Sequence, residues 1–327
     1  MDRRENVIRT VHFSGPEYVP VLFFNQDKEQ SDIIVVDVVH HFTGPEENIS
    51  EWGFTWNKLD GTMGQPDREL VTDPEDLSGL SVPDTAAAER FSSIVTEREK
   101  YGKDRYYLAG IALSGFTVMT FLYGFENTLE TLYQNPDSLE KLADLVFQYE
   151  MDIISELPEY GFDGVAFYDD WGTQQSLMVS PDLWRSFFKH RYREQFDLAH
   201  KLGLDVYFHS CGYYYEIIPD LLEIGVDILN ISQPNLYDIG SLGRVFAGDV
   251  CFLCPVSYQT TSISGTEEDI FRAVASMLSN LATPDGGFIG YVEEYSSIGM
   301  PPENYHACIR AFRELGADYR RLPESIR

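Results

Sequence analysis

The chain has 327 residues, with 24 Lys and Arg against 53 Asp and Glu, so its formal net charge is −29. This acidity argues against nucleic acids and anionic membranes as main partners, because phosphates are bound by clustered basic side chains. No run of 18 apolar residues and no signal-peptide core is present, and four cysteines are too few for a disulfide framework in a chain of this length. We therefore expect a cytoplasmic protein with reduced thiols.

Eight short segments rich in β-branched and aromatic residues are predicted to be strands, and most are separated by longer helical patterns. In chain order they are Val19–Phe24, Ile33–Val39, Tyr106–Ala112, Gly164–Asp169, Leu204–His209, Val226–Ile231, Asp249–Cys254 and Gly287–Val292. Such alternation is typical of a parallel sheet wrapped by helices.

The helices of the C-terminal half carry clear boundary signals. Ser180 supplies an N-cap and Pro181 a proline at the first helical position, so a helix is expected from there to about Lys201, ended by Gly203. Further helices are predicted over Tyr214–Ile224, after Thr266 and over residues 302–316.

Residues 40–100 break this rhythm, and we interpret them as an irregular insertion of short strands and loops that covers one end of the sheet. Eight strands with this repeat favour an α/β fold of the (β/α)8 TIM barrel type, a single domain over residues 1–327. No glycine-rich dinucleotide or phosphate motif follows any strand. Val118, Phe121 and Phe125 lie at helical spacing and are expected in the core.

Active sites of such barrels lie at the C-terminal ends of the strands. The later strands run into Tyr168-Asp169-Asp170-Trp171, His209-Ser210-Cys211, Asn230, Cys254 with Tyr258 beyond it, and Glu293-Glu294. A purely structural sheet would not need polar and sulfur-containing residues at one end, so we expect the functional site there.

The sharpest motif is His209-Ser210-Cys211. Residues two apart in an extended segment point the same way, so the imidazole and the thiolate would face one space and could bind one zinc ion. A catalytic zinc needs a third protein ligand. Glu294 is our first candidate, with Glu293 as its competitor because alternation lets only one point inward, and with Cys254 as a further option.

Asp169 and Asp170 form a second candidate group. Two adjacent carboxylates at a strand end could hold a cation, orient a ligand or transfer a proton, and their mutual repulsion would raise the pKa of one of them. Helix capping is the structural alternative. Trp171 and Gln174 would shape the neighbouring pocket.

From about residue 157 to residue 316 the sequence resembles the uroporphyrinogen decarboxylase-like superfamily. The resemblance rests on Gly164–Asp170 followed by Trp171-Gly172, Ser180-Pro181 with Trp184, His209-Ser210-Cys211-Gly212, Pro219-Asp220-Leu221, Ile224-Gly225-Val226-Asp227 and Pro301-Pro302-Glu303-Asn304. It implies a (β/α)8 barrel, in agreement with the strand pattern.

The superfamily holds two chemistries. The decarboxylases carry an arginine-rich loop after the first strand, whereas here Phe24 is followed by Asn25-Gln26-Asp27-Lys28. The corrinoid-linked methyltransferases bind zinc through an H-x-C motif and a cysteine after the last strand. The first two ligands correspond to His209 and Cys211, while the last position holds Glu294 instead of cysteine, which would make the zinc more Lewis-acidic.

The resemblance and the donor set lead to one hypothesis. The protein would be a zinc-dependent methyltransferase that moves a methyl group between a small molecule, acting as methyl donor or acceptor, and the cobalt of a corrinoid protein. A methyl ether is favoured over a thiol, since a harder Lewis acid suits oxygen. The corrinoid would be carried by a separate partner, because no D-x-H-x-x-G motif is present.

In this hypothesis Asp170, Tyr168 and Gln174 orient the substrate or supply a proton. A second set lines the binding site: Asp169, Trp171, Asn230, Cys254 and Tyr258. Two alternatives stay open, a metal-free decarboxylase-like lyase with Asp170 as its acid, and a non-catalytic barrel that binds an aromatic or tetrapyrrole ligand. The oligomeric state is also open, with a homo-oligomer among the options.

Overall fold

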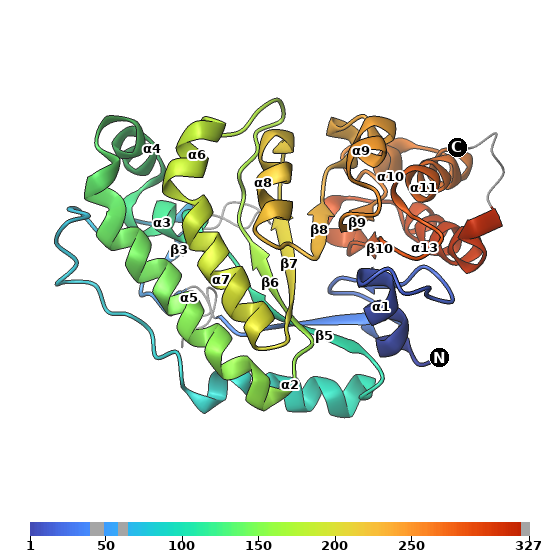
Figure 1. Ribbon diagram of the computed structural model, residues 1–327, viewed down its shortest axis with the longest axis horizontal. Helices are drawn as coiled ribbons and strands as arrows, with labels where there is room; N and C mark the ends of the chain where they lie inside the picture. The colour runs from blue at the N-terminus through green and yellow to red at the C-terminus, as the bar shows by residue number, and fades with distance from the viewer. Residues whose placement is uncertain (40–48, 58–64, 322–327) are drawn as a thin grey trace.

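A computed structural model describes residues 1–39, 49–57 and 65–321, and eight parallel strands close into a barrel (Figure 1). Around the barrel the order is β1-β10-β9-β8-β7-β6-β5-β2. The strands are β1 (Val21–Phe23), β2 (Ile33–Asp37), β5 (Tyr106–Ile111), β6 (Gly164–Tyr168), β7 (Asp205–Ser210), β8 (Ile228–Ile231), β9 (Cys251–Pro255) and β10 (Phe288–Val292). The predicted (β/α)8 barrel is therefore confirmed.

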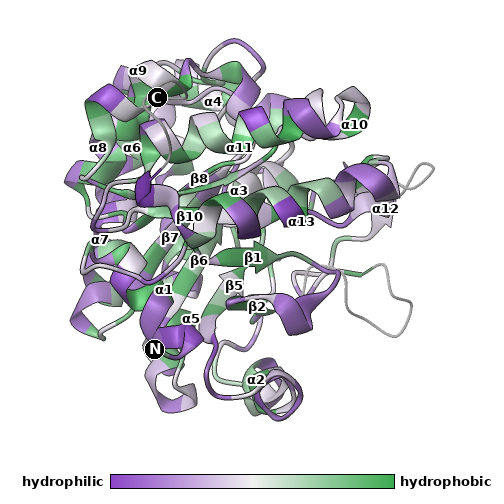
Figure 2. Cartoon of the chain, turned by 90° about the vertical axis from the view of Figure 1, so that its right-hand side faces the viewer, coloured by the Kyte–Doolittle hydropathy of each residue, from purple (hydrophilic) through white to green (hydrophobic). Residues whose placement is uncertain are grey.

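Helices surround this barrel, and their hydrophilic outer faces contrast with the hydrophobic strands inside (Figure 2). They are α1 (Arg3–Val11), α2 (Ala88–Tyr101), α3 (Gly115–Tyr123), α4 (Phe125–Gln134), α5 (Glu140–Tyr160), α6 (Pro181–Phe187), α7 (Lys189–Lys201), α8 (Ile218–Glu223), α9 (Ile239–Phe246), α10 (Thr261–Ser264), α11 (Glu267–Leu281), α12 (Tyr295–Ile298) and α13 (Pro302–Ala317). In the described part of the chain, none of them is long and apolar enough to span a bilayer.

The insertion differs from its prediction. Its last part is the regular helix α2, whose sequence hides the helical period because only a few of its residues are buried, Phe91 and Ile94 among them. Before it, β3 (Trp56–Asn57) and β4 (Gln65–Pro66) form a small antiparallel pair that packs on α3 through Trp56 and Phe121, with ring centroids 5.2 Å apart. Residues 40–48 and 58–64, also part of the predicted insertion, lie outside the described residues.

Two further predictions need correction. The single helix expected over residues 181–201 is divided at Phe188 into α6 and α7, although the Ser180 hydroxyl accepts the Leu183 N–H as the predicted cap. Phe125 is 49% exposed, because α3 ends at Tyr123 and a new helix starts, so the helical spacing does not continue to it.

Strand alternation sorts the barrel residues into two layers. One cluster fills the barrel interior with side chains such as Tyr207, Ile228 and Leu253, while a larger cluster lies between strands and helices. Successive residues of a strand point alternately into the barrel and outward toward the helices, and the first residues after a strand continue this alternation. We call this alternation parity: residues of inward parity point into the barrel, and only they can reach its mouth.

The opposite, N-terminal end of the barrel is stabilised by two histidine–aspartate pairs. His12, which ends α1, lies 3.0 Å from Asp205, and His200 at the end of α7 lies 2.8 Å from Asp227. The hydrogen bond to the aspartate raises the pKa of each histidine above its usual value of 6.5, with burial opposing the change. These pairs connect surface helices to the strands β7 and β8.

These pairs predict a pH-dependent stability. Because both folded-state pKa values are raised, their stabilisation is complete below about pH 6.5 and is lost as the pH rises through the folded values. Both histidine side chains are half-exposed. At low pH the free energy of unfolding of the double variant His12→Gln, His200→Gln should therefore be only about 1 kcal/mol below that of the wild type. Urea denaturation at pH 5.5 and 9 should show that difference at the lower pH alone; an equal difference at both would contradict the assignment.

Candidate metal centre

Three side chains of the types that can bind a metal ion meet at the ends of β6 and β7. Tyr168 on β6 pairs with His209 on β7 in the parallel register. Asp170 and Cys211 lie two residues beyond them, so their side chains point into the barrel as well. The ligand atoms of Asp170, His209 and Cys211 all lie within 4.8 Å of one another. The Cys211 sulfur is 3.5 Å from His209 Nε2, and an Asp170 oxygen is 3.6 Å from the same nitrogen.

A backbone contact fixes this arrangement. The Cys211 N–H donates to Asp170 Oδ1 at 2.7 Å, which joins the two strand ends directly. Just beyond, the loops cross at Gly172 and Gly212, where the Gly172 N–H donates to the Cys211 carbonyl. A Cβ on Gly212 would lie only 2.2 Å from the Gly172 carbonyl oxygen, so the crossing requires glycine.

We predict that Gly212→Ala loses about 3 kcal/mol or more of stability, because the clash adds to the strain of its positive φ of 78°. Gly203→Ala is the matched control, since Gly203 has φ of 77° with no atom near its Cβ position. The control should lose only about 1 kcal/mol. Thermal denaturation measures both, and equal losses would show that the crossing is not tight.

The orientation of His209 leaves one ring nitrogen free for a metal. Asn230 donates through Nδ2 to the Leu253 carbonyl at 2.8 Å, which turns its Oδ1 toward His209 Nδ1. The imidazole therefore carries its proton on Nδ1 and donates it to Asn230. Its Nε2 faces Cys211 and Asp170, and a metal ion bound there would take the place of the Nε2 proton, as in metal-binding histidines held by an outer hydrogen bond.

The electrostatics of the group are those of a paired acid and base. Burial opposes ionisation of Asp170, but the hydrogen bond and charge of His209 and the N–H of Cys211 hold its pKa below the usual value. Burial would lower the pKa of His209, yet the Cys211 sulfur and the Asp170 carboxylate raise it well above 6.5. The pocket thus concentrates negative charge around the imidazole, which suits a divalent cation.

The donor set fits zinc. One sulfur, one imidazole nitrogen and one carboxylate oxygen are ligand types that zinc accepts, and three protein ligands leave the fourth position of a catalytic site open. Asn230 supplies the outer contact that such a histidine needs.

The third ligand position differs from the sequence prediction. Glu294 is not part of the group; its carboxylate accepts a hydrogen bond from Ser296 at 2.6 Å, and its backbone begins α12. Tyr291 packs in the barrel interior, so Glu293 takes the inward parity and accepts the Tyr291 hydroxyl at 2.6 Å. Burial raises the pKa of Glu293, and the charge of His209 acts in the opposite direction.

Cys254 does not reach the mouth. It is fully buried in the layer between strands and helices, because Cys251 and Leu253 take the interior parity of β9. Burial raises the pKa of its thiol well above the usual value. Its predicted part in ligand or substrate binding is therefore not supported.

Asp169 and Trp171, predicted to bind substrate, are both fully buried. Asp169 caps α3: it accepts the N–H groups of Phe116 and Thr117, each at 2.9 Å, and the Thr117 hydroxyl at 2.7 Å. Trp171 stacks on Phe116 with ring centroids 4.5 Å apart. Both residues hold α3 in place, and the contacts of Asp169 are those of the helix cap that was its structural alternative.

Glu150 also holds the start of α3 in place. It is buried on α5 and accepts the Gly115 N–H and the Gln195 amide, both at 2.6 Å. Burial is the main cause that raises its pKa to about 8, and the charge of Asp169 adds to the effect. Gln195 Oε1 is buried without a hydrogen-bond partner in the described part of the chain.

Replacing Glu150 with glutamine should remove a pH-dependent loss of stability. The folded-state pKa of about 8 lies above the usual value of 4.5 for this carboxyl, so the contribution of Glu150 to stability is greatest below about pH 4.5 and is lost as the pH rises toward 8. A neutral amide can also pair with Gln195 Oε1. At pH 9 we expect the free energy of unfolding of Glu150→Gln, measured by urea denaturation, to exceed that of the wild type by about 1 kcal/mol or more. If the two proteins show parallel pH profiles of stability, this prediction is wrong.

The remaining predicted residues lie around the mouth. The Tyr168 ring is 5.2 Å from the His209 ring, and the charges of Cys211 and Asp170 contribute to the raised pKa of Tyr258, whose main cause is burial. Gln174 is exposed and donates to Gln233 at 3.0 Å. Asp170, His209 and Cys211 are called the metal group from here on. Tyr168 and Tyr258 lie near it, and Gln174 is on the outer rim.

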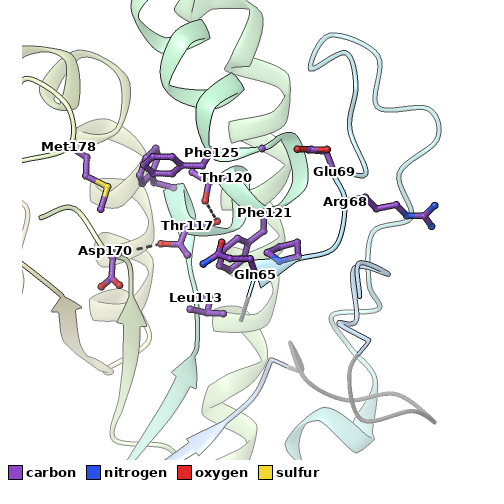
Figure 3. A pocket seen from close by; sticks show the side chains of 13 residues that line it. Gln65, Arg68, Glu69, Leu113, Thr117, Thr120, Phe121, Phe125, Asp170 and Met178 are labelled. Carbon is purple, nitrogen blue, oxygen red and sulfur yellow. Dashed lines mark hydrogen bonds between the residues drawn. The ribbon is translucent and has the colours of Figure 1, made fainter. Parts of the chain in front are cut away.

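A cavity of about 480 Å³ adjoins the metal group, and Asp170 lines it (Figure 3). Its inner wall is α3, through Phe116, Thr117 and Phe121, together with Leu113. Leu113 has a positive φ of 59°, a strain that is characteristic of functional sites. The sequence reasoning missed this wall, although residues directly after the third predicted strand belong to the mouth by the same barrel rule.

Solved structures are similar to this chain to different degrees. A methyltransferase from Methanosarcina mazei is 17% identical with a TM-score of 0.72, and the match covers 96% of this chain and 99% of that one. A D-psicose 3-epimerase from Clostridium cellulolyticum H10 is 11% identical with a TM-score of 0.45, covering 70% and 83%. No curated protein matches the sequence significantly.

The family model described as uroporphyrinogen decarboxylase (URO-D) matches residues 59–315. This range contains six of the eight barrel strands, all but β1 and β2, which precede it. It also includes the three residues of the candidate metal centre. The chain belongs to the uroporphyrinogen decarboxylase family.

Proposed function

We propose that the protein is a zinc-dependent methyltransferase that moves a methyl group between a small molecule and the cobalt of a corrinoid protein. The observation that carries the proposal is the convergence of Asp170, His209 and Cys211, with Nε2 of the histidine freed for a metal by Asn230. The likeness over the full length to a methyltransferase from Methanosarcina mazei supports methyl transfer.

The donor set favours a methyl ether over a thiol as substrate. A carboxylate in place of a second thiolate leaves zinc a harder Lewis acid, which suits an oxygen ligand. When bound, zinc would polarise the ether oxygen and so stabilise the departing phenolate or alkoxide. The corrinoid would be supplied by a separate protein.

The chain's own residues would prepare this step. Asn230 holds the proton of His209 on Nδ1, and the Asp170 carboxylate is oriented by the Cys211 N–H. Burial keeps the pKa of Tyr258 well above neutrality, so its phenol stays protonated and can donate a hydrogen bond to the departing oxygen. Tyr168 lies beside the imidazole and limits the space for water.

Metal analysis tests the proposal. We expect about one zinc per chain, lost in Cys211→Ala and in His209→Ala. Asn230→Ala should weaken zinc binding about 10–100-fold, because the imidazole loses its outer hydrogen bond. Glu294→Gln and Cys254→Ala are controls that should keep the metal. Zinc retained in Cys211→Ala, or lost in Glu294→Gln, would refute the ligand assignment.

Activity is tested with free cob(I)alamin in place of the corrinoid protein. Zinc-loaded wild type should form methylcobalamin from an aryl methyl ether, while Cys211→Ala should not. Release of carbon dioxide from a tetrapyrrole acid, without methyl transfer, would instead support a lyase.

A further inference from the structure

One side of the barrel mouth is uncharged, and it is formed by the loops after β6, β7, β8 and β9. Residues 171–181, 211–215, 232–237 and 256–266 contain no Asp, Glu, Lys, Arg or His. Charged residues make up 24% of the chain, so four such runs around one part of the mouth are not expected from composition alone. Depletion of charge is typical of surfaces that bind a partner.

Side-chain amides on these loops are joined by hydrogen bonds into a chain that we call the amide arc, made of Gln174, Gln233, Asn235 and Gln259. Asn235 Nδ2 donates to Gln259 Oε1 at 3.0 Å, and Gln259 Nε2 donates to Gln174 Oε1 at 3.2 Å. Gln174 Nε2 donates in turn to Gln233 Oε1 at 3.0 Å. The amide arc therefore connects the loops after β6, β8 and β9 across the mouth.

A backbone donor sets the direction of this chain of hydrogen bonds. The Gly212 N–H donates to Gln233 Oε1 at 3.0 Å, so this oxygen is an acceptor and Gln174 must turn its nitrogen toward it. The amide nitrogens of Gln174, Asn235 and Gln259 each carry two protons and use one of them within the arc. In the part of the chain that the structure describes, no second acceptor meets these nitrogens, and the three side chains are exposed. The amide arc thus offers a row of free N–H donors.

Around the mouth, the metal group lies between the cavity and the amide arc. The cavity wall α3 follows β5, the metal group follows β6 and β7, and the arc continues over β8 and β9, the next strands around the barrel. Asp170 lies at the edge of the cavity (Figure 3), and Gly212, which holds the arc, directly follows Cys211. A partner that covers the amide arc is therefore next to the metal group, on the side away from the cavity.

From these contacts we infer that the amide arc binds the corrinoid itself, by donating hydrogen bonds to the carbonyl oxygens of its carboxamide side chains. The inference rests on the proposed methyl transfer and names the chemical feature of the partner that the mouth recognises. The edge of a corrin ring carries uncharged carboxamides, whose carbonyl oxygens are acceptors for the free N–H groups of the arc. An uncharged surface suits them, because a charged side chain would lose its water there without gaining an ion pair.

Equilibrium dialysis with cyanocobalamin tests this inference. Both axial positions of its cobalt are filled, so binding reports contacts with the ring and its side chains. Wild type should bind it with a dissociation constant below about 1 mM. Gln174→Glu and Gln259→Glu each replace donor N–H groups by a charged carboxylate of the same size and should weaken binding about tenfold. Gln175→Glu is the matched control, since it adds the same charge at an exposed neighbouring position outside the arc, and it should change the affinity less than about twofold.

Equal losses of affinity in Gln174→Glu and Gln175→Glu would overturn the inference, because net charge alone would then explain them. Absence of saturable binding by wild type up to about 1 mM would overturn it as well, since the mouth would then recognise only the polypeptide of the corrinoid protein. The measurement needs neither zinc nor turnover. A protein without zinc that still binds cyanocobalamin through the arc would contradict the proposed function alone, whereas normal zinc content with unchanged affinity in both arc variants would contradict this inference alone.

Discussion

The site depends on the pairing of β6 with β7 and on the hydrogen bond between the Cys211 N–H and the Asp170 carboxylate. The parallel register brings both strand ends to the same height on the barrel, and side-chain alternation turns Asp170, His209 and Cys211 inward. A shift of β7 by one residue against β6 would turn Ser210 inward in place of His209 and turn Cys211 away, so two of the three side chains would leave the group. The glycine crossing at Gly172 and Gly212 holds this register from the loop side.

The same strand end supports two functions through adjacent residues. Asp170 faces the metal group, whereas Asp169 faces outward and caps α3, the wall of the cavity. Thr117 connects them, because its hydroxyl donates to Asp169 and accepts the Asp170 N–H at 3.3 Å. Metal group and cavity are therefore parts of one hydrogen-bonded unit. A movement of α3 would therefore be transmitted through Thr117 to Asp170.

Much of this could be predicted from the sequence. The strand pattern predicted all eight barrel strands, and the H-x-C spacing predicted two inward side chains. That Asp170 and not Asp169 lies beside them could not be predicted, because the two are equivalent until the end of β6 is known. The choice between Glu293 and Glu294 depends in the same way on the end of β10, where Glu293 is the residue that follows Tyr291 inward. The cavity wall was overlooked because Thr117 looks unremarkable without the carboxylate that it binds.

X-ray absorption at the zinc edge tests the central claim most directly, since it counts the sulfur and the nitrogen or oxygen ligands around the metal. The account predicts one sulfur at about 2.3 Å, from Cys211, with a histidine imidazole and oxygen ligands completing the shell. Replacing Asp170 with asparagine should change the oxygen shell and leave the single sulfur in place. Two sulfur ligands, which would require a second cysteine, or a shell without sulfur would contradict it.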